Sequence, residues 1–181
     1  MSAAVNLDAL VRAGRPPWLP SPDARDLDPW EKYDFPSCGT YWLGDRLVVF
    51  TLITTAGRRS LWAYAPVQAG QERAVEEASF DTESDFEAFL AASFADREVI
   101  FAAAEDFRIA WKSDGIWLPP APGALLAAAT RWYVQRAIAL GLIPEGAALP
   151  AASAADASES EESQQKLLRE AQRVLASAGR P

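Results

Sequence analysis

The fold of this chain is decided by residues 46–66, which read RLVVFTLITTAGRRSLWAYAP. Residues 46–55 form a nearly continuous run of apolar and β-branched side chains, which predicts a strand buried on both faces at the centre of a sheet. Gly57 marks a turn, and residues 59–66 then alternate between two faces. The alternation puts Leu61 and Ala63 on one face and Trp62 and Tyr64 on the other. The stretch therefore predicts an antiparallel hairpin in the core.

Periodicity and turn signals predict further elements on both sides of this hairpin. These elements are a helix over 3–13, an irregular arm over 18–36, a short strand at 40–43, a short helix within 71–78, a helix from the cap residues 81–85 to Asp96, strands at 97–103 and 106–112, a return strand from Ile116 after an Asp114-Gly115 turn, and a helix over 123–140. In the strand at 106–112, Phe107, Ile109 and Trp111 are expected on one face.

The fold class that follows is α+β: an antiparallel sheet of five or six strands with helices packed on one face, in the order α-βββ-α-ββ(β)-α, plus a tethered C-terminal helix. Residues 1–143 are expected to form the compact domain, 144–158 a flexible linker and 159–181 the amphipathic helix. The order of elements resembles the small α+β topology of type III secretion chaperones and related bacterial regulators. The segment 15–37 has two interpretations, since it can cover its own sheet or reach to a second subunit.

The chain contains no histidine and one cysteine among 181 residues. This composition excludes a Ser-His-Asp triad, a Cys-His pair and the usual histidine-based zinc sites, and it leaves no internal disulfide. No phosphate-binding glycine motif and no nucleophile-elbow motif is present. We therefore expect no catalytic residue, no cofactor and no metal site. Cys38 is expected to be a buried structural thiol.

The formal net charge is −8. Such a charge repels nucleic-acid phosphates, and no apolar run approaches the length of a membrane span, so nucleic acid and membrane are not expected partners. The N-terminus has no basic region of the signal-peptide type, which makes the cytoplasm the expected compartment. Fourteen of the 17 basic residues are arginine, a bias typical of a high-GC bacterium or its phage. The expected partner is another protein, with a basic protein or a second copy of the chain as candidates.

Acidic residues are densest between 72 and 87. The alternating acids from Asp81 lack the central glycine of a calcium-binding loop, so an acidic helix start is the favoured interpretation. The same run could instead contact a basic partner through Glu76, Glu77, Asp81 and Glu83. The adjacent Glu105 and Asp106 are expected to mark a hairpin turn rather than a catalytic pair.

Aromatic and apolar residues supply the other candidate contacts. The aromatic candidates are Trp62, Tyr64, Trp111 and Trp117, which either form the core or leave one or two rings exposed as a binding surface. Leu168 and Leu175 lie on the narrow apolar seam of the last helix. That seam could dock back on the domain, and we expect it instead to dock on a partner or a second copy.

Three hypotheses about function follow. The first is a non-enzymatic protein-interaction module, such as an adaptor, a chaperone-like protein or an inhibitor. The second is an immunity or antitoxin protein whose acidic run blocks a basic toxin. The third is an enzyme that relies on carboxylate and arginine groups, which the missing motifs disfavour.

Overall fold

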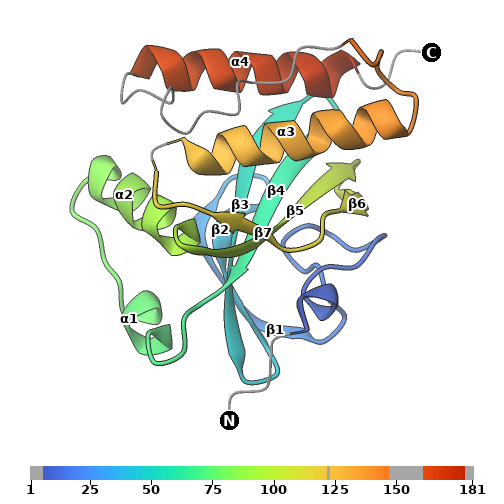
Figure 1. Ribbon diagram of the computed structural model, residues 1–181. Helices are drawn as coiled ribbons and strands as arrows, with labels where there is room; N and C mark the ends of the chain where they lie inside the picture. Colours follow the sequence, from blue (N-terminus) through green and yellow to red (C-terminus); the bar gives the residue numbers. More distant parts are fainter. Residues whose placement is uncertain (1–5, 122, 147–160, 178–181) are drawn as a thin grey trace.

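The computed structural model describes residues 6–121, 123–146 and 161–177. Six strands follow one another in a single antiparallel sheet in the spatial order β1-β2-β3-β4-β5-β6 (Figure 1). Their bounds are β1 (Ala24–Lys32), β2 (Pro36–Leu43), β3 (Arg46–Ala56), β4 (Arg59–Pro66), β5 (Arg97–Glu105) and β6 (Arg108–Lys112), and a seventh strand, β7 (Ile116–Leu118), also pairs with β5. The predicted central position of the 46–55 run is confirmed, since β3 lies between β2 and β4 and is largely buried.

Strands β6 and β7 are two halves of one return path along β5. Glu105 pairs with Arg108 at the start of this path, and Arg97 pairs with Leu118 at its end. Between the halves, Ser113 maintains the ladder: its N–H donates to the Phe101 carbonyl and its Oγ accepts from the Phe101 N–H, both at 2.8 Å. The predicted reversal at Asp114-Gly115 is therefore wrong. The chain reverses at Asp106-Phe107, one residue beyond the turn that the sequence predicts at Glu105-Asp106.

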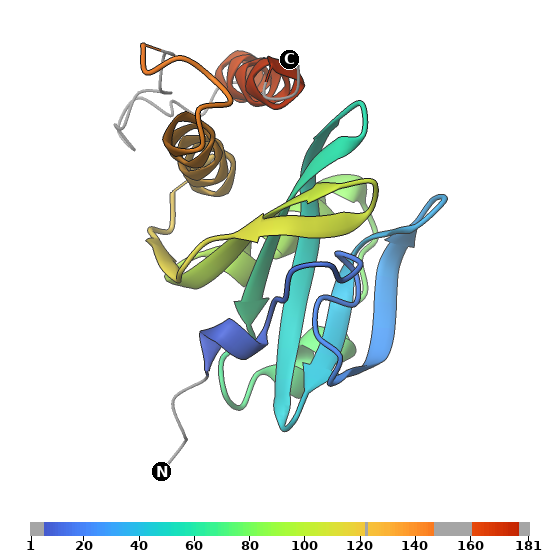
Figure 2. The same ribbon diagram turned by 90° about the vertical axis from the view of Figure 1, so that its right-hand side faces the viewer.

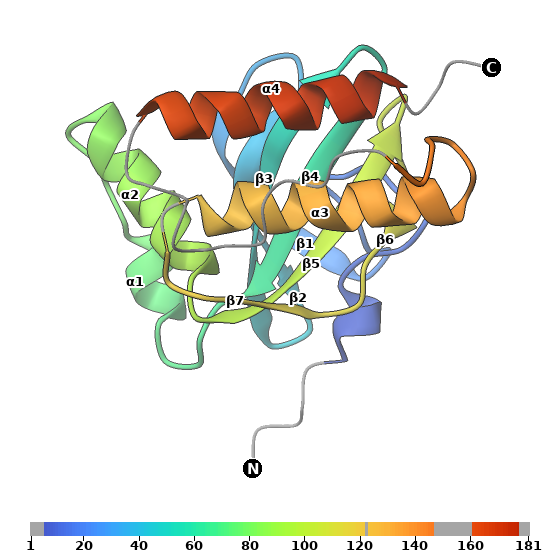
Figure 3. The same ribbon diagram turned by 45° about the horizontal axis from the view of Figure 1, so that its top comes forward.

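The helices are α1 (Glu72–Glu76), α2 (Glu83–Phe94), α3 (Ala124–Ala139) and α4 (Glu161–Ser177). Thr82 caps α2 by accepting a hydrogen bond from the Asp85 N–H at 3.1 Å, as the cap cluster predicts. Gly141, with a φ of 70°, ends the α3 segment. Figures 2 and 3 show α3 and α4 side by side on one face of the sheet, and α2 packs on β4 and β5 in the same layer. This arrangement confirms the predicted α+β class.

The sheet has a hydrophobic core on each face. On the helix face, Leu61 and Ala63 pack with residues of α2, α3 and α4. On the opposite face, Trp62 and Tyr64 are fully buried beneath the N-terminal segment, which contributes Leu10. The predicted division of the β4 side chains between two faces is thus confirmed. Both faces are covered, so neither β4 ring is exposed.

The N-terminal segment is the covering layer of that second face. The predicted helix over 3–13 is reduced to one turn of 3-10 helix, η1 (Leu7–Ala9), and residues 1–5 lie outside the described part. The hydroxyl of Tyr41 donates to the Leu10 carbonyl at 3.1 Å, and that of Tyr64 donates to the Pro17 carbonyl at 2.8 Å. These two bonds hold the segment on its own sheet, and tertiary contacts thereby override a weak helical pattern.

The predicted irregular arm also proves to contain a strand. Residues 24–32 form β1 at the edge of the sheet, paired with β2 through a register that shifts three times. Asp26 adopts a φ of 53°, and Pro29 lies in the middle of the strand. Such irregularities are tolerated at a sheet edge, where they discourage pairing with another chain. None of the described helices combines the length and apolar character that crossing a membrane requires.

Candidate functional site

Three hairpin turns lie at one end of the sheet, because consecutive antiparallel strands reverse there. The turns contain residues 33–35 between β1 and β2, Gly57-Arg58 between β3 and β4, and Asp106-Phe107 between β5 and β6. The Asp106 N–H donates to the Arg58 carbonyl at 2.9 Å, and the Arg58 guanidinium forms an ion pair with the Asp106 carboxylate. This ion pair keeps the pKa of the Asp106 carboxyl below its usual value. We call this region the hairpin end.

An aromatic cluster rises from the core to the surface at the hairpin end. The Phe35 ring lies 6.0 Å from the buried Trp62 ring and 5.5 Å from the Trp18 ring. The Phe107 ring lies 4.9 Å from Phe35 and 5.8 Å from Trp18. Phe107 is 51% exposed, and Tyr33 in the neighbouring turn is 78% exposed. We call Trp18, Tyr33, Phe35 and Phe107 the aromatic surface.

The backbone under this surface is strained. Asp106 and Phe107 both have positive φ, at 49° and 60°. A two-residue hairpin turn with this geometry is normally built from Asn-Gly or Gly-Gly, because a bulky side chain crowds the backbone there. Strain of this kind persists only where surrounding contacts enforce it, and it concentrates at functional positions. The ring contacts with Phe35 and Trp18 supply that enforcement for Phe107.

Acidic residues are frequent along the edge strand β1 and in the turn after it. Four exposed acids lie in β1 or in the turn after it: Asp26, Asp28, Glu31 and Asp34. Glu31 and Asp34 lie next to the turn that carries Tyr33 and give the aromatic surface an acidic border, whereas Asp26 lies near the opposite end of β1. An apolar centre with a charged rim is the usual composition of a protein interface.

No family model, curated protein or solved structure matches this chain. The resemblance in element order to type III secretion chaperones therefore receives no support from known structures.

The structure disperses the aromatic residues that the sequence singled out. Trp62 and Tyr64 are fully buried, so the hypothesis that they form a surface is wrong; both are core residues. Trp111 is partly buried against Tyr133 of α3, with ring centroids 5.6 Å apart. Trp117 is 61% exposed on β7, in agreement with the expectation that one or two rings remain accessible.

The terminal helix docks on its own domain. Ala171, Val174 and Leu175 are buried against α3 and the sheet, and Leu168 is partly buried. The Arg59 guanidinium also donates to the Leu175 carbonyl at 3.2 Å. The expectation that this seam docks on a partner or a second copy is corrected, since the sheet and α3 of the same chain supply the apolar seat.

The acidic candidates Glu76, Glu77, Asp81 and Glu83 are exposed. Two of them already have partners within the chain: Glu77 pairs with Arg73 at 2.7 Å, and Glu76 accepts from the Trp42 indole N–H at 3.0 Å. Among the described residues, no group of three or more acids and cysteines is arranged to hold a metal ion. The acidic run therefore does not converge on one point.

The aromatic surface was not predicted from the sequence. The sequence identifies Trp18, Tyr33 and Phe35 only as apolar anchors of the arm. It identifies Phe107 only as a strand residue. One signal for Phe107 was available in the sequence. Asp106-Phe107 lies at the junction of two predicted strands, and a tight turn there without glycine or asparagine is unusual, which indicates that the phenylalanine serves a purpose other than reversing the chain. Cys38 is buried, as expected. Its burial, together with the nearby Glu31, raises the pKa of its thiol to about 11, which is unsuitable for a nucleophile.

Proposed function

We propose that this protein is a non-enzymatic interaction module that binds another protein through the aromatic surface at the hairpin end. The observation that carries the proposal is the Phe107 ring, which is half exposed although its backbone is held at a positive φ. A turn that served only to reverse the chain would be more stable with glycine at this position. Retaining a large apolar ring there is explained if the ring makes a contact outside the chain.

The surface is rigid enough to serve as a recognition site. Phe107 contacts two rings, and Phe35 connects it to the buried Trp62. Side chains held in this way lose little conformational entropy on binding, and exposed aromatic residues are frequent hot spots of protein interfaces. The acidic border along β1 and the net charge of −8 favour a partner segment that combines apolar and basic side chains.

The acidic run supports the alternative immunity function less well. Its members take part in contacts within the chain: Asp85 forms the cap of α2 with Thr82, and Glu77, the residue after α1, pairs with Arg73 of α1. The enzyme hypothesis would gain support from any turnover that a single Asp or Glu substitution abolishes. The aromatic surface favours the interaction module over both alternatives, because reversing the chain at Phe107 does not require a half-exposed aromatic ring.

The test compares variants of the full chain as immobilised baits for proteins of the source cell. Phe107→Asn removes the ring and keeps a residue that tolerates positive φ, so the turn should persist. Leu142→Ser is the matched control, because Leu142 is also an exposed apolar residue but lies after α3. We expect a partner that the parent and Leu142→Ser retain and Phe107→Asn loses. With the purified partner, Phe107→Asn should weaken Kd by about 30-fold, the effect of a typical hot spot.

The proposal is wrong if the Phe107→Asn bait retains the same proteins in the same amounts as the parent. A circular dichroism melt of each variant shows that a lost contact does not reflect a lost fold. A fourth bait carries Glu76→Gln and Glu77→Gln. A partner that this bait loses and the other three retain would favour the immunity alternative.

A further inference from the structure

Strand β7 lies at the far end of β5 from the hairpin end, on the second edge of the sheet. Glu98 of β5 pairs with Trp117 of β7, whereas Glu105 adjoins the Asp106-Phe107 turn. At about 3.3 Å per residue, Glu98 and Glu105 are about 23 Å apart along the strand. The surroundings of Trp117 are therefore a surface separate from the aromatic surface.

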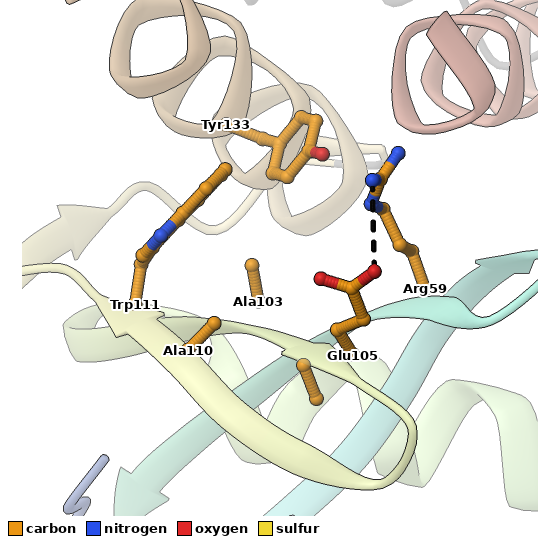
Figure 4. A pocket seen from close by; sticks show the side chains of 7 residues that line it. Arg59, Ala103, Glu105, Ala110, Trp111 and Tyr133 are labelled. Atoms are coloured by element: carbon orange, nitrogen blue, oxygen red, sulfur yellow. Dashed lines mark ion pairs between the residues drawn. The ribbon is translucent and has the colours of Figure 1, made fainter. Parts of the chain in front are cut away.

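The β6 half of this edge has partners within the chain. The Gly14 N–H donates to the Ile109 carbonyl at 2.7 Å, and the Ile109 N–H donates to the Arg15 carbonyl at 2.9 Å, so the N-terminal segment pairs with the outer side of β6. The Trp111 ring turns to the helix face, where it stacks on the Tyr133 ring of α3 (Figure 4). Both the outer backbone and the large ring of β6 are thus occupied.

The β7 half of the edge directs hydrogen-bonding groups outward. Phe101 of β5 donates its N–H to the Ser113 Oγ, and its carbonyl accepts from the Ser113 N–H, both at 2.8 Å. Because successive residues of an antiparallel strand point these groups to opposite sides, Val99 also faces β7 and Glu98 does not. Trp117, opposite Glu98, therefore directs its N–H and carbonyl away from β5. Outside the ladder, no hydrogen bond to either group occurs among the described residues.

The side chains of Trp117 and Glu98 lie together beside this outward backbone. Directly opposed residues of an antiparallel pair share a face, and their side chains are closest where the pair is not hydrogen-bonded. Trp117 is 61% exposed, and Glu98 is exposed as well. A Cβ at Gly115 would lie 3.3 Å from the Glu98 carboxylate, so this glycine leaves room for the carboxylate to lean across β7. In the part of the chain that the structure describes, that carboxylate has no ion pair or hydrogen bond.

The charges around the Trp117–Glu98 pair are mainly negative. Asp96 and Asp114, which flank the paired segments in sequence, are exposed. Of the neighbouring basic residues, Lys112 forms an ion pair with Asp8 at 2.9 Å, and Arg97 donates to two backbone carbonyls. A cation brought by a partner would therefore meet an exposed indole and an uncompensated carboxylate, which is a favourable combination.

From this arrangement we propose that β7 binds an extended basic segment of another protein as an added strand. The residue of that segment opposite Trp117 exchanges two backbone hydrogen bonds with it, and its arginine or lysine side chain lies on the indole and pairs with the Glu98 carboxylate. A second copy of this chain fits less well, because pairing two β7 edges brings like charges together and each chain has a net charge of −8. Affinity for a short peptide on so short an edge is on the order of millimolar.

The test is an NMR titration of the full chain, followed at the backbone N–H of residue 117 and at the Trp117 indole N–H. The probe is the capped pentapeptide Thr-Val-Arg-Val-Thr, whose β-branched residues favour an extended backbone. One control peptide has glutamine in place of arginine, and the other carries a methyl group on the arginine backbone nitrogen. We expect saturable shifts with the probe and at least about fivefold weaker binding of each control.

Two variants remove the side chains that the proposal uses. Trp117→Thr removes the ring and keeps a residue that favours strands, and Glu98→Gln removes the charge and keeps the shape. Both positions are exposed, so melting temperatures should stay within a few degrees of the parent. Each variant should bind the arginine peptide about fivefold more weakly, close to the affinity of the glutamine peptide. Phe107→Asn is the matched control and should leave peptide binding unchanged, because Phe107 lies at the hairpin end.

The proposal is overturned if the arginine peptide gives no saturable shift at residue 117, if either control peptide binds as tightly, or if Trp117→Thr keeps the parent affinity. Shifts of the same signals on raising the protein concentration without peptide would identify a second copy as the occupant and would also overturn it. Loss of the hairpin-end partner and loss of peptide binding are separate results, so the two proposals can fail independently.

Discussion

Ile109 and Trp111 are two residues apart on β6, yet their side chains lie on opposite faces of the sheet. Ile109 packs in the core beneath the N-terminal segment, and Trp111 packs toward α3. The register explains the reversal: Ala104 pairs with Ile109 and Ala103 with Trp111, so Ala110 is an extra residue in β6. A bulge of this kind inverts the side-chain alternation beyond it. It turns Trp111 toward Tyr133 of α3 and leaves Ile109 in the opposite core.

Deleting Ala110 should therefore destabilise the protein although the residue itself is exposed. Without the bulge, Trp111 would turn to the face of Ile109 and lose its stacking on Tyr133. We expect the free energy of unfolding to fall by about 2–3 kcal/mol, measured by urea denaturation. Ala110→Ser is the control, since it keeps the residue count and should change stability by less than about 0.5 kcal/mol. A deletion variant as stable as the parent would show that the bulge has no structural role.

The packing of α4 predicts that its apolar seam stabilises the domain. Val174 and Leu175 are buried, and each such burial contributes about 1.5–3 kcal/mol. Val174→Ser/Leu175→Ser should therefore lower the free energy of unfolding by about 3–6 kcal/mol, whereas Gln172→Ser, an exposed position on the same helix, should have little effect. Thermal melting followed by circular dichroism measures both.

The same measurement on a chain ending at residue 146 tests the domain boundary. The sequence predicts that residues 1–143 fold alone and melt within a few degrees of the full chain. The buried seam of α4 predicts a clearly lower melting temperature for the shortened chain, because Leu61 and Tyr133 would lose their cover. Equal melting temperatures would show that α4 is not part of the cooperative core.

Gly39 should be the least replaceable glycine of the sheet. A Cβ at this position would lie 2.2 Å from the Asp28 carbonyl oxygen and 2.8 Å from the Pro29 Cα, both backbone atoms of β1. Gly39→Ala should therefore displace β1 and cost more than about 2 kcal/mol of stability. Gly57→Ala is the matched control, because its Cβ would meet open space and only its φ of 62° is unfavourable, at about 1 kcal/mol. Similar losses in urea denaturation for the two variants would contradict this account of β1.

Cys38 should react slowly in the folded protein. Burial raises the pKa of the thiol to about 11 from its ordinary value of 9.0, so about one thiol in a thousand is ionised at pH 8, against about one in ten in an unfolded chain. Reaction with a disulfide reagent should accelerate about 100-fold in denaturing urea. Fast labelling of the native protein would mean that Cys38 is accessible and ionised.

The same shift has a defined effect on stability. The folded pKa lies above the unfolded one, so the contribution of Cys38 is fully present below pH 9 and is lost as pH rises from about 9 to about 11. Cys38→Ala should lack this part of the pH dependence. Parent and variant curves that stay parallel over that range would refute the shift.

Local chemistry in the sequence was sufficient for much of the fold. The apolar run at 46–55, the alternation at 59–66, the Thr82 cap and the Gly141 stop each describe contacts within a few residues, and the structure contains all of them. The N-terminal segment was misread because its apolar residues serve a sheet face more than 30 positions away: the Leu10 carbonyl binds Tyr41 and the Pro17 carbonyl binds Tyr64. Such contacts leave no periodic pattern.

The sequence by itself determined the class of this protein: a core-forming α+β chain with an acidic surface, no histidine and a helical C-terminal segment. Only the tertiary structure decided which side chains are exposed and which residues from distant parts of the chain lie next to one another. The extra residue at Ala110 becomes visible only against its partner strand. Phe107 gathers with Phe35 and Trp18 because the β1–β2 and β5–β6 turns lie at one end of the sheet and the N-terminal segment crosses it. Side-chain alternation is a local property of the backbone, whereas register and the meeting of distant turns depend on how the whole sheet is paired.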